Sequence, residues 1–117
     1  MNGNVDHPIH YSSRDIGHEC IEIVQYQTFL VGNVIKYLWR YKGKGHPVED
    51  LEKALWYAHR ASMMQERVDL DIGHCSRILL RLVETTCGYE SAVWYGLLKN
   101  EWHIVLSALD AMIKEEQ

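Results

Sequence analysis

Four side chains that could bind an anion recur at helical spacing in the first half of the chain. Asn33, Lys36, Tyr37 and Arg40 are separated by three or four residues, which places them on one face of an α-helix. The rest of that segment is apolar, and an arginine fork beside a lysine point charge suits phosphate oxygens. A solvated polar face is the alternative interpretation of the same spacing.

A glycine-rich turn, Lys42-Gly43-Lys44-Gly45, follows this helix. Backbone amides in such a turn, together with the positive end of the next helix, can attract an anion. The turn is not a Walker A loop, because the GxxxxGK[ST] pattern is absent and no strand precedes it. We therefore expect Lys42 and Lys44 to add to a phosphate-binding site, while a plain turn is the simpler interpretation.

The distribution of charge favours a small anionic ligand. Every charged residue between positions 23 and 48 is basic, although the whole protein has a formal net charge of -4. Duplex nucleic acid normally requires a broad basic surface, so an acidic protein with one local cluster of cations is better suited to a nucleotide.

Two imidazoles lie near the start of the chain, in the segment His7-Pro8-Ile9-His10-Tyr11. Imidazoles titrate near neutrality and can donate to phosphate or transfer a proton. The residue before a proline is biased toward extended geometry, so we expect an extended arm over residues 1–16. A packed strap without chemistry is the alternative role for these residues.

Paired carboxylates suggest a further, metal-dependent alternative. Glu19 and Glu22 share one side of the first expected helix, and Glu49 and Asp50 begin a later one. Facing helices could use these four acids to hold Mg²⁺, as in helical nucleotide pyrophosphohydrolases. Helix capping explains the same acids without a metal, and we assign no metal ligand.

The periodicity predicts an all-α fold, because apolar residues recur every three to four positions and no strand pattern is present. We expect one domain over residues 1–117: the arm at 1–16, a motif region at 17–67 and C-terminal helices at 68–117. The pattern predicts a compact bundle of five to six helices, at 18–27, 29–41, 47–67, 71–88, 90–98 and from 101 onward. Thr28 should cap the second helix, Pro47 should lie in the first turn of the third, and Gly88 should end the fourth.

No apolar run is long enough to span a membrane, and the polar start lacks the apolar core of a signal peptide. The three cysteines, Cys20, Cys75 and Cys87, are odd in number and lie in or beside helical patterns, which favours reduced thiols. We therefore expect a cytoplasmic protein, without a membrane partner.

Four motifs occur in a fixed order: His7-Pro8-Ile9-His10-Tyr11, Glu19-Cys20-Ile21-Glu22, Gly32 to Arg40, and Glu49 to Tyr57. Together they resemble the phage nucleotide kinase-like family over roughly residues 5–61. That family includes a podophage kinase that phosphorylates deoxynucleoside monophosphates without a recognisable ATP-binding motif. The resemblance implies that His7, His10, Tyr11, Asn33, Lys36, Arg40 and Lys44 line a nucleotide site. Phosphoryl transfer would then rest on His10, Lys36 and Arg40, with ATP as donor and Mg²⁺ as a candidate cofactor.

Three other functions are compatible with the sequence. A nucleotide sponge that sequesters the signalling nucleotides of bacterial immunity would need the cations but no catalytic base. A pyrophosphohydrolase would use the four acids and a metal. A protein-inhibiting module would use exposed aromatics among Trp39, Trp56, Trp94 and Trp102, although core or oligomer contacts are the simpler role for tryptophan. A stripe of Trp56, His59, Arg60 and Met63 favours a homo-oligomer contact over a ligand base.

Overall fold

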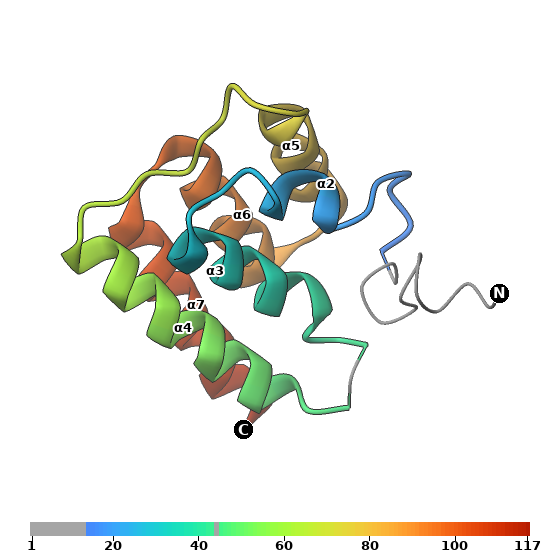
Figure 1. The fold of residues 1–117 in the computed structure, drawn as a ribbon. Helices are drawn as coiled ribbons and strands as arrows, with labels where there is room; N and C mark the ends of the chain where they lie inside the picture. Colours follow the sequence, from blue (N-terminus) through green and yellow to red (C-terminus); the bar gives the residue numbers. More distant parts are fainter. Residues whose placement is uncertain (1–13, 44) are drawn as a thin grey trace, which may run out of the picture.

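A computed structural model describes residues 14–43 and 45–117. In these residues the chain forms six α-helices and no strand, which confirms the all-α fold (Figure 1). The helices are α2 (Ile21–Val24), α3 (Phe29–Arg40), α4 (Pro47–Met63), α5 (Cys75–Thr85), α6 (Gly88–Lys99) and α7 (Trp102–Glu116). No helix among the described residues is long and apolar enough to cross a membrane.

The helices pack as a closed ring around one core. Two hairpins, α3 with α4 and α6 with α7, are joined where α4 packs against α7. On the other side α5 packs against α6, and the short α2 contacts both α3 and α5 (Figure 1). Helix α3, which carries the candidate phosphate ligands, therefore packs against α4 and shares an outer surface with it.

Local signals set the starts of α3 and α4, as expected. The Thr28 hydroxyl accepts a hydrogen bond from the Val31 amide at 3.2 Å, which satisfies a free donor of the first turn. Pro47 begins α4, and Glu49 and Asp50 follow in its first turn, where the helix dipole favours acids. These signals set the residues at which α3 and α4 begin.

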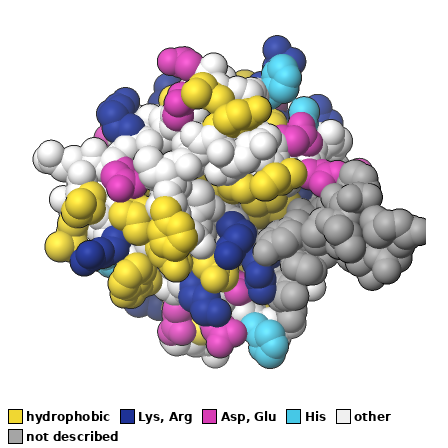
Figure 2. Space-filling view, in the orientation of Figure 1, with side chains coloured by type: hydrophobic (Ala, Val, Ile, Leu, Met, Phe, Trp, Pro, Cys, Tyr) yellow, Lys and Arg dark blue, Asp and Glu magenta, His cyan; other side chains and the backbone are white. Residues whose placement is uncertain are grey.

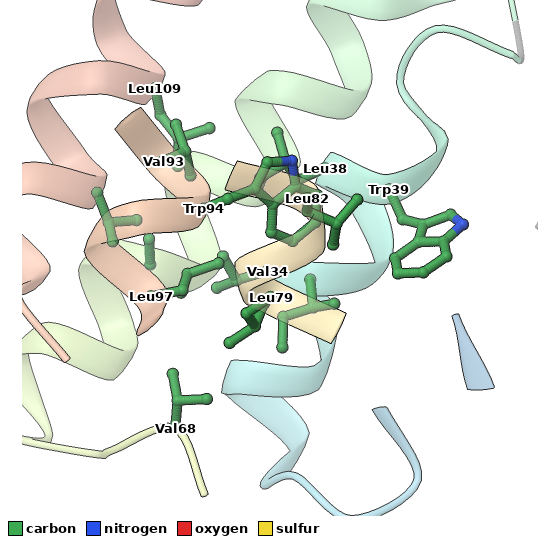
Figure 3. Packing of buried hydrophobic residues seen from close by; sticks show 14 of the residues in the cluster. Val34, Leu38, Trp39, Val68, Leu79, Leu82, Val93, Trp94, Leu97 and Leu109 are labelled. Carbon is green, nitrogen blue, oxygen red and sulfur yellow. The ribbon is translucent and has the colours of Figure 1, made fainter. Parts of the chain in front are cut away.

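Two tryptophans form the centre of the core. Trp39 of α3 and Trp94 of α6 are buried and meet edge to face, with ring centroids 6.3 Å apart. Figure 3 shows aliphatic side chains such as Leu38, Leu82 and Val93 around Trp94, with Trp39 at one side of the cluster. Trp39 and Trp94 are thus core residues, as the simpler interpretation expected, whereas Trp56 on α4 is 58% exposed.

Amide side chains hold the long α4–α5 connection against the bundle. The Gln27 side chain donates to the Asp69 carbonyl and accepts from the Asp69 amide, at 3.0 and 2.8 Å. Asn100 makes the same pair of bonds with Val68, at 3.2 and 2.6 Å. The connection is therefore ordered without being helical.

Several expected helix boundaries are wrong. The helix expected at 18–27 is shortened to Ile21–Val24, because beyond it the amides of Tyr26 and Gln27 bond only three residues back, as in turns. The helix expected to reach residue 67 ends at Met63, and Gln65 adopts a left-handed backbone with φ 56°. The fourth helix, expected from residue 71, begins at Cys75, and Ile72 before it is 40% exposed. Gly88 begins α6 and does not end α5, whose C-cap is Thr86.

Candidate functional site

The α3–α4 hairpin presents two matching rows of side chains. On α3 the expected row of Asn33, Lys36, Tyr37 and Arg40 lies on one half-exposed face. On α4 the same spacing gives Lys53, Trp56, Tyr57 and Arg60. We call these eight residues, together with Phe29 at the start of α3, the hairpin face.

Aromatic contacts join the two rows. The rings of Tyr37 and Tyr57 stack across the helices, with centroids 6.0 Å apart and planes 11° from parallel. Phe29 and Trp56 each meet Tyr57 edge to face, at 5.8 and 5.1 Å. Phe29 and Trp56 remain 73% and 58% exposed, so the centre of the hairpin face is packed while its two outer rings are open to solvent.

Three cations surround the ring of Tyr37. Lys36 Nζ lies 4.4 Å from the ring centroid, Lys53 Nζ 5.4 Å and Arg40 Cζ 5.6 Å, all within cation–π range. Figure 2 shows basic side chains beside hydrophobic ones on this side of the molecule. Within residues 14–43 and 45–117, neither Lys36 nor Lys53 has a carboxylate at ion-pair distance. Both ammonium groups could therefore bind an anion without first releasing an acid.

Arg40 has a structural partner as well. Its Nε lies 3.5 Å from Oδ2 of Asp50, a carboxylate that is only 2% exposed. The ion pair joins the last turn of α3 to the first turn of α4 and compensates a charge that would be costly to bury alone. The Arg40 guanidinium therefore already neutralises Asp50. An anion that binds Arg40 would share this guanidinium with the Asp50 carboxylate.

Lys42 belongs to a second group of charges, which is centred on Glu90 in the first turn of α6. The Glu90 carboxylate is 4% exposed and forms ion pairs with Arg14 at 2.6 Å and Lys42 at 3.2 Å. It also accepts hydrogen bonds from the Tyr41 hydroxyl at 3.0 Å and from Trp94 Nε1 at 3.1 Å. We call these five residues the Glu90 cluster.

Burial alone would raise the pKa of Glu90, but the charge on Arg14, the Trp94 hydrogen bond and the charge on Lys42 together hold it below its usual value. Burial of Tyr41, followed by the charge of Glu90 and the hydrogen bond to it, raises the pKa of the Tyr41 hydroxyl. Glu90 is therefore ionised and Tyr41 neutral at physiological pH. Arg14 also donates to the carbonyls of Leu38 and Trp39, both at 3.0 Å, and so binds the end of α3 to the start of α6.

The remaining candidate residues are distributed as follows. The Asn33 amide donates to the Phe29 carbonyl at 2.8 Å, which keeps its side chain along α3. His7, His10, Tyr11 and Lys44 lie outside the described residues. The structure thus brings together Lys36, Tyr37 and Arg40, and assigns Lys42 to the Glu90 cluster.

Sequence reasoning missed Lys53, Tyr57, Arg14 and Glu90. A signal for the first two was present, because Lys53-x-x-Trp56-Tyr57-x-x-Arg60 has the spacing of the α3 row. No comparable signal marks Glu90, which looks like an ordinary first-turn acid and is buried only because Arg14 and Tyr41 come from distant parts of the chain.

The four acids of the metal hypothesis are not gathered. Among the described residues no group of three or more His, Cys, Asp or Glu side chains could hold a metal ion. Glu22 accepts from the Glu19 amide at 2.6 Å and contacts His18 at 3.1 Å, while Asp50 faces Arg40. Helix α2 packs against α3 and α5, whereas α4 packs against α3 and α7, so the two acid pairs belong to different contacts.

Comparison with protein families gave one match, over residues 5–59, to a family described as a protein of unknown function (DUF3310). The chain is similar to this family. Comparison with curated proteins and with solved structures gave no match. The matched region includes all of α3 and most of α4, and therefore nearly all of the hairpin face, but it leaves α5, α6 and α7 outside.

Proposed function

We propose that this protein binds nucleotides through the hairpin face. The observation that carries the proposal is the group of three cations around Tyr37, two of which have no acidic partner among the described residues. Lys36 and Lys53 would contact phosphate oxygens as point charges, and Arg40 would add its guanidinium while it continues to neutralise Asp50. Because the whole protein has a net charge of -4, the attraction of phosphate groups should be confined to the hairpin face.

Aromatic side chains beside the cations favour a nucleotide over a simple anion. Phe29 and Trp56 are large exposed rings, and each lies against Tyr57 next to the cations. A base can stack on such a ring because every base has an apolar π-face. Inorganic phosphate would use the cations alone and gain nothing from the rings.

Phosphoryl transfer is the reaction that the resemblance suggests, and we keep it as the second candidate function. Such catalysis consists mostly of positioning and charge neutralisation, which Lys36 and Arg40 could supply. Any Mg²⁺ would arrive on the phosphates of ATP, because the described acids form no metal group of their own. His10 would assist the acceptor oxygen. A sponge would use the same cations without turnover.

The test incubates the purified protein with ATP, deoxynucleoside monophosphates and cyclic signalling nucleotides, with and without Mg²⁺. Mass spectrometry then identifies both the nucleotides in solution and those released by heat. New di- or triphosphates would indicate a kinase, and an unchanged nucleotide recovered only after denaturation would indicate a sponge.

A matched set of variants assigns any binding to the hairpin face. Lys36→Gln and Lys53→Gln should each lower affinity about tenfold, which corresponds to about 1.4 kcal/mol. Lys99→Gln is the control, because Lys99 also lies over a tyrosine ring, that of Tyr95 on α6, at 5.8 Å. Equal losses in all three variants, or no retained nucleotide together with no change in any nucleotide, would refute the proposal.

A further inference from the structure

We propose that the hairpin face takes a short single strand of nucleic acid, with at least two linked nucleotides, rather than one mononucleotide. This inference rests on the proposed function, since it uses Lys36 and Lys53 as the first phosphate position. It adds a second phosphate position at Arg60 and assigns the two exposed rings, Trp56 and Phe29, to two different bases. The ligand class follows from how these four features are spaced and exposed.

The second phosphate position lies further along α4. Arg60 is exposed, its guanidinium carbon lies 5.9 Å from the Trp56 ring, and it forms no ion pair with any other described residue. Lys53 and Arg60 are seven residues apart, which separates their backbones by about 10 Å at 1.5 Å per residue. One phosphate group is too small to contact both of them, but successive phosphates of a strand could do so.

Two aromatic platforms accompany the two cation positions. Trp56 lies between Lys53 and Arg60 on α4, and Phe29 lies on the α3 side of the same central ring, Tyr57. Because both rings contact Tyr57 at an edge, each is held in place by packing while most of its surface stays free. This arrangement offers one platform to each of two bases.

The degree of exposure argues against a mononucleotide pocket. Pockets for small ligands bury most of the ligand surface in a concave site. Here the two platforms are 73% and 58% exposed, as expected of an open surface on which a strand lies with its bases against aromatic rings. Short strands also supply the repeated negative charge that several unpaired cations attract.

A second copy of the chain is the competing occupant, and charge disfavours it. A two-fold interface places the same patch on both sides. Such an interface would bring Lys36, Lys53 and Arg60 of one copy toward the same basic patch of the other, and within its own chain none of the three is paired with a described acid. Like charges across an interface are unfavourable, whereas a phosphodiester strand is complementary to all three.

Fluorescence titration or calorimetry with four probes tests the inference: a 5′-monophosphate nucleoside, a 5′-phosphorylated dinucleotide, a tetranucleotide and a duplex of equal length. Deoxy and ribo versions of each strand distinguish DNA from RNA. We expect the dinucleotide to bind at least tenfold more tightly than the mononucleotide, with one strand per chain. A plot of the logarithm of the association constant against the logarithm of the salt concentration should have a slope of about -1.4 for two phosphates and about -0.7 for one.

Variants at the second position complete the test. Arg60→Gln should weaken dinucleotide binding about tenfold while changing mononucleotide binding less than twofold. Trp56→Ala should also weaken dinucleotide binding about tenfold. Tyr95→Ala and Lys99→Gln are controls, because they remove an exposed ring and its cation with the same spacing on α6. Both Trp56 and Arg60 are exposed, so loss of folding would not explain an effect.

Each remaining outcome has a definite meaning. Equal affinity for one and two nucleotides, with Arg60→Gln silent and Lys36→Gln still harmful, would overturn this inference and leave the proposed function intact. Failure of all probes to bind would overturn both. A dimer in sedimentation that Trp56→Ala converts to monomer, without any change in nucleotide affinity, would mean that a second copy occupies the face.

Discussion

The hairpin face and the Glu90 cluster use the same kinds of residue to different ends. Both bring basic side chains next to aromatic rings: Lys36 lies over Tyr37 on α3, and Arg14 lies over Trp94 beside the end of α3. In the Glu90 cluster a buried carboxylate accepts from all four neighbours, so the charges are satisfied internally. On the hairpin face no described acid meets Lys36, Lys53 or Arg60. A buried acid thus marks a cluster that stabilises the fold, and its absence marks one that can bind a ligand.

Removing the charge at the centre of the Glu90 cluster should have the largest effect. Glu90→Gln leaves Arg14, a side chain only 11% exposed, without a counter-ion and weakens the bond between α3 and α6. We expect a loss of about 3 kcal/mol in the free energy of unfolding, as is usual when one partner of a buried pair is removed. Urea denaturation measures this loss, with Glu52→Gln at an exposed position of α4 as the control. A change below about 0.5 kcal/mol, typical of surface substitutions, would mean that the cluster is not a stabilising element.

Acid should reproduce part of the same loss. Because the pKa of Glu90 in the folded protein is below its ordinary value of 4.5, the unfolded chain binds protons first as the pH falls. The stabilisation is therefore complete above the ordinary value and is lost as the pH falls through the lower, native value. Urea midpoints from pH 7 to pH 3 should decrease more for the wild type than for Glu90→Gln. Glu22, whose pKa is also lowered, contributes equally to both proteins, so parallel curves would argue against this role of Glu90.

Arg40 combines features of the two regions, because it faces a buried acid, as the residues around Glu90 do, and also belongs to the hairpin face. Arg40→Gln should cost about 2 kcal/mol of stability, less than Glu90→Gln, since the contact with Asp50 is longer and Arg40 is 19% exposed. It should also lower nucleotide affinity about tenfold. Lys53→Gln is the matched variant and should lower affinity while leaving the urea midpoint unchanged. Loss of affinity without loss of stability in Arg40→Gln would make Arg40 a binding residue only.

The comparison also explains which features the sequence could predict. Thr28 and Pro47 act on neighbouring amides within a few residues, so the starts of α3 and α4 could be predicted. The α3 row follows from helical spacing alone. Glu90 differs, because its burial depends on Arg14, which is 76 residues earlier in the chain. The contact of Gln27 with Asp69 was missed for a similar reason, since Asp69 lies in a connection that no local pattern describes.

Lys42 gives the smallest expected effect and the sharpest distinction between the two regions. It is 67% exposed, and Glu90 retains Arg14, Tyr41 and Trp94 when Lys42 is lost, so Lys42→Gln should cost only about 0.5 kcal/mol. If Lys42 serves only the Glu90 cluster, nucleotide affinity should be unchanged in the same variant. An affinity loss as large as that of Lys36→Gln would mean that an arriving phosphate draws Lys42 away from Glu90. The cluster would then be part of the binding site, and nucleotide affinity would depend on the same carboxylate that stabilises the fold.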